Sequence, residues 1–367
     1  MSAEDRAWEI VRRAFAERDP APAHARNRLP FAIAIAAAGV VLAAVFSPPG
    51  HAVFEQVRRA VGVQHAAPAL FSLPAPGALL VQSAEAGGTW IVEQDGARRP
   101  LGDWEYASWS PHGKFIVAAK QNELVALDPK GHVRWALARR NVSSPSWEGT
   151  SVDTRIAYFT GSGLRVVAGD GTGDHLLDAN AAFEPVAWDP ARLHTLAYET
   201  GGAVVLRNVD TGAELWRRNV PFYGRLAWSD DGARVAVVGA HRIVVLDARG
   251  RQISFVGSLR GYVRDAAFKP ATHVLAVAAR LAGRSQVKLV DVDRPANARL
   301  LFAGPGIFGS IAWSPSGDWL LVDWPTANQW LFLHGAQVHA VANVRQQFPR
   351  PDGLGPMFEL SSSWCCR

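Results

Sequence analysis

The chain has 367 residues, of which 49% are apolar and 19% charged, a composition typical of a folded protein. Its net charge of +5 is mild, and its basic residues are scattered in isolated pairs such as Arg12-Arg13 and Arg217-Arg218. Nucleic-acid binding needs a dense basic stripe, so this distribution argues against it. Length alone would suggest two or three domains.

Residues 1–28 are predicted to form a polar cytoplasmic segment with one amphipathic helix. Ser2 and Asp5 resemble the start of a capping box. Trp8, Val11 and Phe15 follow at helical spacing, with arginines on the other faces. Two interpretations remain open for this helix. It rests on an anionic membrane surface, or it is a docking helix for a cytoplasmic partner through Trp8, Val11 and Phe15.

An apolar tract follows at 29–47 and predicts one transmembrane helix. Residues 29–46 carry no charge and would reach about 27 Å as a helix, close to the roughly 30 Å of a bilayer core. Six arginines precede the tract, while only Arg58 and Arg59 follow it closely. This bias places the N-terminus in the cytoplasm and the rest outside a bacterial-type cell membrane. A cleaved signal peptide is the alternative, but no small-residue cleavage site follows directly.

Residues 48–76 are predicted to be an extracytoplasmic spacer. The segment 51–61 can form a short amphipathic helix, and 66–77 is rich in Pro and Ala. Such a composition is typical of a semi-rigid linker.

From residue 77 to 367 an aromatic residue returns at a period near 40. The steps between the first six positions are 38, 41, 40, 40 and 45 residues. This period is typical of four-stranded propeller blades. The repeating residues are Trp109, Trp147, Trp188, Trp228, Phe268, Trp313 and Trp364. One aromatic per blade at one strand position indicates packing between blades rather than a ligand site.

Six of these motifs give six blades, and the two ends of the region supply a seventh. The runs 78–82, 89–95 and 97–101 have the pattern of second, third and fourth strands without a first. The run 357–364 has the pattern of a first strand without the rest. Joining them predicts an all-β, seven-bladed propeller closed by a blade that both ends share, with no open sheet edge left.

The repeats carry a family resemblance. Trp-Ser-Pro-x-Gly at Trp109 and Trp313 resembles the WD-repeat and TolB-like propellers of bacteria. Asp-Thr-Gly-Ala-Glu-Leu-Trp at 210–216 resembles the tryptophan-docking repeat of quinoprotein-type propellers. The resemblance covers about 77–364 and implies the fold, while its implication for function is broad because such folds host many roles. The chain departs from both patterns, since no Gly-His opens its blades and most blades lack the docking motif.

Residues that break the repeat are the candidate contact surface for a ligand or partner. They cluster in three loops leading into first strands, and in a blade rich in tryptophan. A mixture of aromatic, Arg and Gly residues suits a binding surface, although ordinary loop filling explains it equally well. The candidates are Phe222, Tyr223, Arg225, Arg260, Tyr262, Arg264, Phe308 and Trp324.

No pattern of catalytic, cofactor-binding or metal-ligating residues emerges from the sequence. The eleven histidines lack metal-ligand spacing, and no hydrolase, phosphate-loop or EF-hand motif occurs. The only cysteines, Cys365 and Cys366, are adjacent. Neighbouring Cα atoms lie about 3.8 Å apart, below the usual disulfide range. Free thiols beside the closing strand are therefore favoured over a vicinal disulfide, with a redox or soft-metal site as the sharper alternative.

Together these features favour a membrane-anchored, extracytoplasmic, non-enzymatic binding or signalling protein. Its expected partner is a protein, peptide or glycan, and it needs no cofactor. An envelope scaffold is a second interpretation. A propeller enzyme with a site at the central channel, whether a quinoprotein-like oxidoreductase, a lyase or a hydrolase, is the third.

Overall fold

The computed structural model describes residues 72–366, with gaps at 84–87, 257–260 and 349–359. The chain divides into two units, Met1–Phe54 and Glu55–Arg367. The predicted transmembrane tract, the spacer before residue 72 and the docking residues Trp8, Val11 and Phe15 all lie outside the described residues. Within those described residues, no helix is long and apolar enough to cross a membrane.

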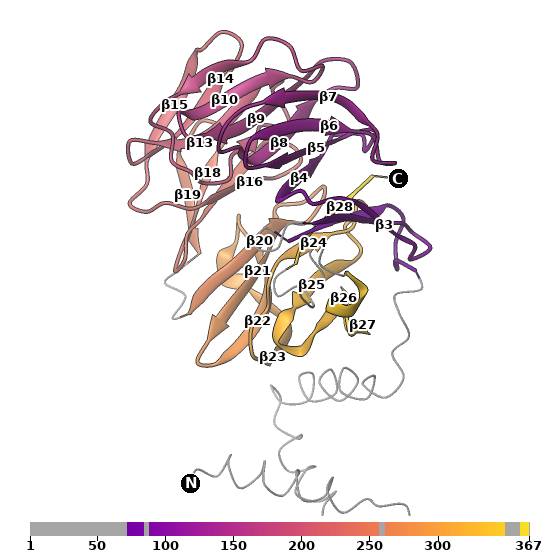
Figure 1. The fold of residues 1–367 in the computed structure, drawn as a ribbon. Coiled ribbons are helices and arrows are strands. Elements are labelled where there is room, and N and C mark those ends of the chain that lie inside the picture. The colour runs from indigo at the N-terminus through magenta and orange to yellow at the C-terminus, as the bar shows by residue number, and fades with distance from the viewer. Residues whose placement is uncertain (1–71, 84–87, 257–260, 349–359, 367) are drawn as a thin grey trace, which may run out of the picture. The chain divides into compact units, whose positions relative to one another are not determined.

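The described chain forms seven four-stranded antiparallel sheets, each a blade of one propeller (Figure 1). The first blade combines the two ends of the region: β28 (Ser361–Cys365), β1 (Ala78–Gln82), β2 (Thr89–Val92) and β3 (Arg98–Gly102). The second to fourth blades are β4 (Tyr106–Trp109), β5 (Ile116–Lys120), β6 (Glu123–Leu127) and β7 (Val133–Ala138); β8 (Ser143–Gly149), β9 (Thr154–Thr160), β10 (Gly163–Ala168) and β11 (His175–Asp178); and β12 (Ala187–Trp188), β13 (Thr195–Thr200), β14 (Ala203–Asn208) and β15 (Glu214–Asn219).

The remaining three blades follow in the same order along the chain. They are β16 (Arg225–Trp228), β17 (Arg234–Val238), β18 (Ile243–Asp247) and β19 (Gln252–Val256); β20 (Tyr262–Phe268), β21 (Val274–Leu281), β22 (Arg284–Asp291) and β23 (Arg299–Pro305); and β24 (Ile311–Trp313), β25 (Leu320–Trp324), β26 (Gln329–His334) and β27 (Gln337–Ala342). In the described part of the chain, three short 3-10 turns interrupt the loops, η2 (Pro295–Asn297), η3 (Pro325–Ala327) and η4 (Arg345–Gln347).

The ring closes through the predicted shared blade. β28 pairs antiparallel with β1, with Trp364 opposite Leu79 and Ser361 opposite Gln82. In Figure 1 the yellow strand β28 lies beside the indigo strands of the first blade. The first strands of neighbouring blades contact one another all round, including β24 with β28 and β28 with β4. The prediction of seven blades closed by both ends is therefore confirmed.

Burial follows the position of each strand in its blade. The two middle strands are continuous apolar runs, such as Ile116–Ala119 on β5 and Leu124–Leu127 on β6, because neighbouring blades cover both faces. The outermost strands alternate, as β7 and β3 do, because one face meets solvent. The apolar residues gather into clusters between blades rather than into one central core.

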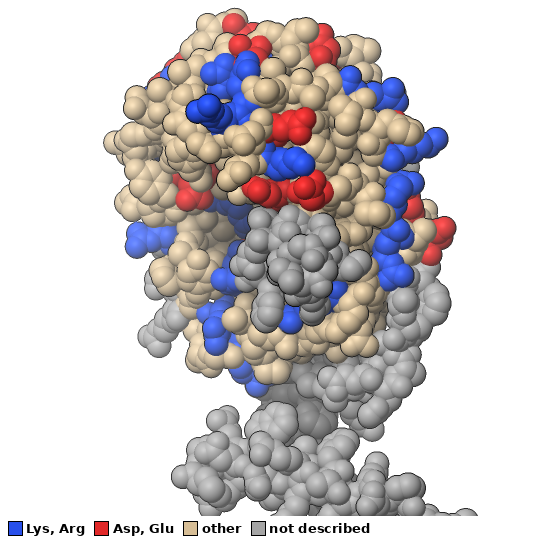
Figure 2. All heavy atoms as spheres, viewed as in Figure 1, with Lys and Arg blue, Asp and Glu red and all other residues tan. Residues whose placement is uncertain are grey.

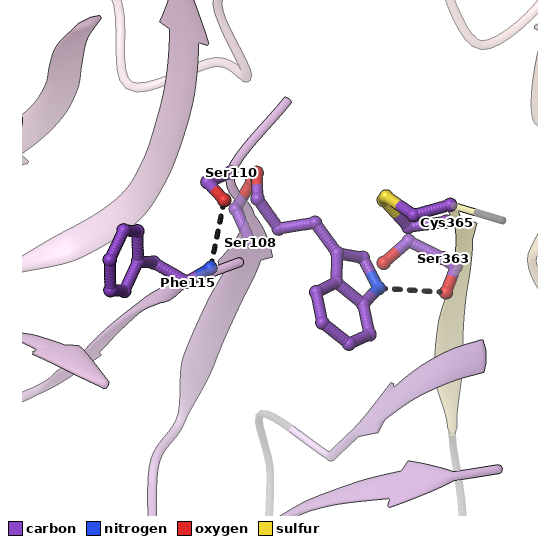
Figure 3. Close-up of a disulfide and its surroundings, with 7 residues drawn as sticks. Ser108, Ser110, Phe115, Ser363 and Cys365 are labelled. Atoms are coloured by element: carbon purple, nitrogen blue, oxygen red, sulfur yellow. Dashed lines mark hydrogen bonds between the residues drawn. A yellow bond between two sulfur atoms is a disulfide. The ribbon is translucent and has the colours of Figure 1, made fainter. Parts of the chain in front are cut away.

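The repeating aromatic residues lie on the seven first strands and contact the preceding blade. The indole N–H of Trp188 donates to the Ser146 carbonyl at 3.1 Å, and that of Trp228 donates to the Ala187 carbonyl at 3.2 Å. Trp313 makes the same bond to Ala267 at 3.2 Å, and Trp109 a longer one to Ser363 at 3.4 Å (Figure 3). Each acceptor immediately precedes the aromatic residue of the preceding blade, so the bond repeats with the fold.

Cys365 and Cys366 form a vicinal disulfide at the end of β28, so the expectation of free thiols is not met (Figure 3). Successive side chains of an extended strand point to opposite faces. Cys366 leaves the strand with a φ of +65°, and this turn brings its sulfur to that of Cys365. The disulfide packs against Gly113 in the turn between β4 and β5.

Candidate functional site

The predicted contact surface is only partly exposed. Tyr223, in the loop leading into β16, is 59% exposed, and Tyr262, the first residue of β20, is 46% exposed. Phe222 is half-buried beneath the guanidinium of Arg242. Arg264 lies over the Tyr262 ring at 5.7 Å. Arg225 forms an ion pair with Asp265 of the next blade, so its charge is already matched within the protein.

Two of the predicted surface residues belong to the core instead, and a third is not described. Phe308 is fully buried, and Trp324 is 5% exposed. Their rings pack together at 5.4 Å, and the Trp324 indole donates to the Pro305 carbonyl at 3.0 Å. Both side chains fill the gap between the sixth and seventh blades, which is why they interrupt the repeat. Arg260 lies outside the described residues.

A cavity of about 540 Å³ opens instead between the second and third blades. Its walls come from the turns between β4 and β5, β8 and β9, and β10 and β11, and from residues on β6, β7, β8 and β9 near the same end of the strands. Tyr223 and Tyr262 lie at the opposite end of the first strands, so the cavity lies on the other face of the ring. The lining residues that matter below are Phe115, Trp135, Trp147, Val152, Thr154 and Asp170.

Trp147 belongs to the aromatic repeat but lacks the hydrogen bond to the preceding blade that most of its counterparts make. Its indole N–H is buried and has no hydrogen-bond partner among the described residues, like that of Trp364 and unlike that of Trp109, Trp188, Trp228 or Trp313. The ring stacks instead on Phe115, with centroids 6.1 Å apart and planes within 15°. β8 carries a bulge between Ser143 and Ser146 just before this residue, a feature that commonly re-aims side chains.

Local hydrogen bonds hold the other walls. The hydroxyl of Ser110 accepts from the Phe115 N–H at 2.9 Å, which fixes the turn that carries the phenyl ring (Figure 3). Trp135 on β7 crosses the gap between blades and donates its indole N–H to the Gly169 carbonyl at 2.9 Å. Glycine at 171, with a φ of +86°, lets the Trp135 ring approach the backbone closely. Three aromatic rings therefore line the cavity, and hydrogen bonds fix the turn that carries Phe115 and the indole of Trp135.

Two of the other gaps between blades carry a polar cluster at this place, here called the clasp. Between the third and fourth blades, Arg155 Nε donates to Asp210 at 2.9 Å, and His194 Nδ1 lies 2.6 Å from the same carboxylate. Between the fifth and sixth blades, Arg234 Nε donates to Asp293 at 2.8 Å, and His273 Nδ1 lies 2.6 Å from Asp293.

Strand register identifies the corresponding residues at the cavity. Ile156, Val235 and Ile116 pair with the aromatic residues of their first strands, so Phe115 takes the place of Arg155 and Arg234. His194, His273 and Thr154 each lie two residues before the residue that pairs with the aromatic residue of their blade. Thr154 therefore takes the place of the two histidines. Ala168, Asn208 and Asp291 are equivalent, and two residues later Asp170 corresponds to Asp210 and Asp293.

The gap between the second and third blades, here called the open seam, thus keeps the clasp aspartate but lacks its arginine and histidine. Asp170 is exposed, and its pKa is lowered by hydrogen bonds from Thr172. None of the described residues forms an ion pair with it. At the clasp, by contrast, burial opposes the charge on Asp210, yet Arg155 and His194 outweigh burial and lower its pKa.

The charges near the open seam are mixed. Lys114, His112 and Arg134 line the cavity beside Asp170, and Arg134 is paired with Asp128 at 2.9 Å. On the face in view in Figure 2, basic and acidic side chains are likewise interspersed rather than gathered by sign. Among the described residues, no group of three or more His, Cys, Asp or Glu side chains is arranged to hold a metal ion.

The sequence does contain a signal for this site, but it is not a departure from the tryptophan period. Trp147 and Trp135 both fit regular patterns, so they read as structural residues. The informative comparison is between blades, at the positions flanking each second strand, where Phe115 and Thr154 replace an arginine and a histidine. That comparison needs the register of every blade, which the sequence alone does not supply.

Comparison with known proteins shows the fold alone. No protein-family model matches the sequence, and no curated protein matches it. The β-propeller domain of Cps50 (Swd1) from Myceliophteria thermophila is similar at a TM-score of 0.50 and 14% identity, covering 65% of this chain and 85% of that one. The WD40 domain of Pan2 from Neurospora crassa is similar at a TM-score of 0.53 and 11% identity, covering 73% and 91%. The protein is thus a propeller with WD40-like neighbours.

Proposed function

We propose that this protein is a non-catalytic binding protein that holds a segment of a protein partner in the open seam. The observation that carries the proposal is the cavity itself. The rings of Phe115, Trp135 and Trp147 line it, together with the carboxylate of Asp170, which forms no ion pair with any described residue. Aromatic side chains and a few well-placed polar groups are the usual lining of recognition sites. Trp147 strengthens the case, because it forgoes the bond to the preceding blade that most of its counterparts make.

A photo-crosslinking residue placed at position 152 tests this site. Val152 lines the cavity and is 92% exposed, so a probe there disturbs little packing. Leu193, 51% exposed in the corresponding turn of the fourth blade, is the matched control because an intact clasp closes the gap beside it. We expect a discrete adduct from position 152 in native membranes and none from 193. Equal labelling at both positions would contradict the proposal.

The non-catalytic part of the proposal has its own test. Incubation of the purified full chain with a broad panel of hydrolase, lyase and dehydrogenase substrates should give no turnover above that of heat-denatured protein. Turnover that survives a blocked open seam would instead favour the propeller enzyme with a site at the central channel.

We also propose that the apolar tract at 29–46 anchors the propeller outside a bacterial-type cell membrane. The support is its length and the arginine bias before it. An arrangement of anchor, spacer and rigid ring would suit either signalling to a partner at Trp8, Val11 and Phe15 or an envelope scaffold of the TolB-like kind. Protease added to intact spheroplasts should digest the propeller and spare the first 28 residues. The reverse pattern would refute this orientation.

A further inference from the structure

We infer that the open seam recognises an arginine side chain of the partner, which takes the place that Arg155 and Arg234 occupy in the clasps. This inference rests on the proposed binding function and names the chemistry of its ligand. The geometry is set by the fold: in both clasps an arginine from one blade spans the gap to an aspartate of the next. At the open seam the aspartate stands in the equivalent position and the arginine is missing.

The walls of the cavity suit a guanidinium group. Its planar, weakly hydrated cation stacks on aromatic faces and pairs with carboxylates through two parallel hydrogen bonds. Phe115 and Trp147 supply the stacking surface, and Asp170 supplies the carboxylate. The chain already places arginines over rings elsewhere, with Arg242 5.5 Å from Phe222 and Arg207 5.7 Å from Tyr198.

The basic residues at the cavity restrict what can surround that arginine. Lys114 and His112 come from the turn before Phe115, and a partner with several clustered positive charges would be repelled by Lys114. Charge complementarity is therefore best for an arginine flanked by an aspartate or glutamate. The cavity volume of about 540 Å³ exceeds one side chain, which leaves room for the neighbouring residues of an extended segment.

The first experiment measures binding of small probes to the full chain in detergent by calorimetry. The probes are N-acetyl-arginine amide, its neutral near-isostere N-acetyl-citrulline amide, and N-acetyl-lysine amide. We expect arginine to bind at least about threefold more tightly than citrulline or lysine, the size of one modest ionic interaction. The Asp170→Asn variant should abolish this preference. Equal binding of arginine and citrulline, or an unchanged preference in Asp170→Asn, would overturn the inference.

The second experiment rebuilds the clasp. The double variant Phe115→Arg/Thr154→His places arginine and histidine where the closed seams have them, so the protein's own arginine should occupy the site. We expect probe binding to disappear without a loss of thermal stability. Asp210→Asn is the matched control, because it weakens an existing clasp and should lower stability while leaving probe binding unchanged. Arginine binding retained by a folded double variant would count against the inference.

The outcomes separate the inference from the proposed function. If N-acetyl-phenylalanine amide binds and arginine gains no advantage, the cavity is a binding site of another specificity and only the inference fails. If none of the probes binds, the inference fails as well. If, in addition, the crosslink from position 152 persists unchanged in the double variant, the open seam is not the contact site and the proposed function fails with it.

Discussion

The imidazole of His273 lies between two carboxylates, with Nδ1 2.6 Å from Asp293 and Nε2 2.9 Å from Asp231. Burial disfavours the charged ring, but the two carboxylates outweigh burial and raise the pKa of His273. A raised pKa stabilises the fold below the unfolded pKa of about 6.5, and this contribution is lost as pH rises through the folded value.

The variant His273→Gln should therefore cost more stability at about pH 5.5 than at about pH 8.5, by roughly 1 kcal/mol or less, since the cluster is partly exposed. Urea unfolding at both pH values measures the difference. His175→Gln is the control, because that ring contacts a carbonyl rather than a carboxylate. A deficit independent of pH would show that the imidazole stays neutral in the folded protein.

Glu199 on β13 also has a raised pKa, but here the folded protein favours the neutral form of the side chain. Burial raises its pKa to about 7, and one of its oxygens lacks a hydrogen-bond partner among the described residues. The other oxygen accepts from the Gly224 N–H of the next blade at 3.1 Å. The folded state thus holds the proton more tightly than the unfolded state, and stability falls as pH rises from about 4.5 to about 7.

The variant Glu199→Gln keeps an acceptor for Gly224 and cannot ionise. We expect it to be more stable than the parent by about 1 to 3 kcal/mol at about pH 8, and similar to it at about pH 4. Thermal unfolding at the two pH values tests this expectation. A stability gain at low pH only would reverse the inferred sign.

At the scale of elements, the first strands are joined by repeated indole-to-carbonyl bonds. The variant Trp188→Phe removes the part-buried bond from the indole N–H to the Ser146 carbonyl, so it should cost about 1 kcal/mol more than Trp147→Phe. Both substitutions remove the same ring area, and Phe268 already shows that phenylalanine fits this position. Equal losses in chemical denaturation would show that the hydrogen bonds contribute little.

The strands and their closure follow from the sequence because apolar runs, turns and the tryptophan period are local signals. The aromatic repeat predicted six blades, and the loose runs at both ends, including Trp364, predicted the seventh. The open seam was not predicted, because Phe115, Thr154 and Asp170 come from three turns that only the register brings together. The sequence places Phe308 and Trp324 among the surface candidates, but both are buried, because an aromatic residue outside the repeat can fill a gap between blades as well as face solvent.

At the scale of the whole molecule, β28 closes the ring by covering the edge of β1. Removal of residues 361–367 would expose the strand that carries Leu79, Leu80 and Val81, which are buried in the closed ring. An unpaired apolar edge invites association between molecules.

We expect the truncated chain to aggregate and to unfold without a single cooperative transition. Light scattering and calorimetry measure both effects. A synthetic peptide of residues 360–366 should restore the monomeric state, because it supplies the missing strand. A truncated chain that remains monomeric and cooperative would mean that the other six blades close without β28.

The packing of Cys366 against Gly113 has a practical consequence for handling the protein. The turn that contains Gly113 also carries His112, Lys114 and Phe115 at the cavity. Cys366 lies beside this turn, so an affinity tag or fluorophore inserted directly after residue 366 would emerge next to the open seam. Reagents meant to report on partner capture are better attached at a distant exposed loop, such as the one that holds Tyr223.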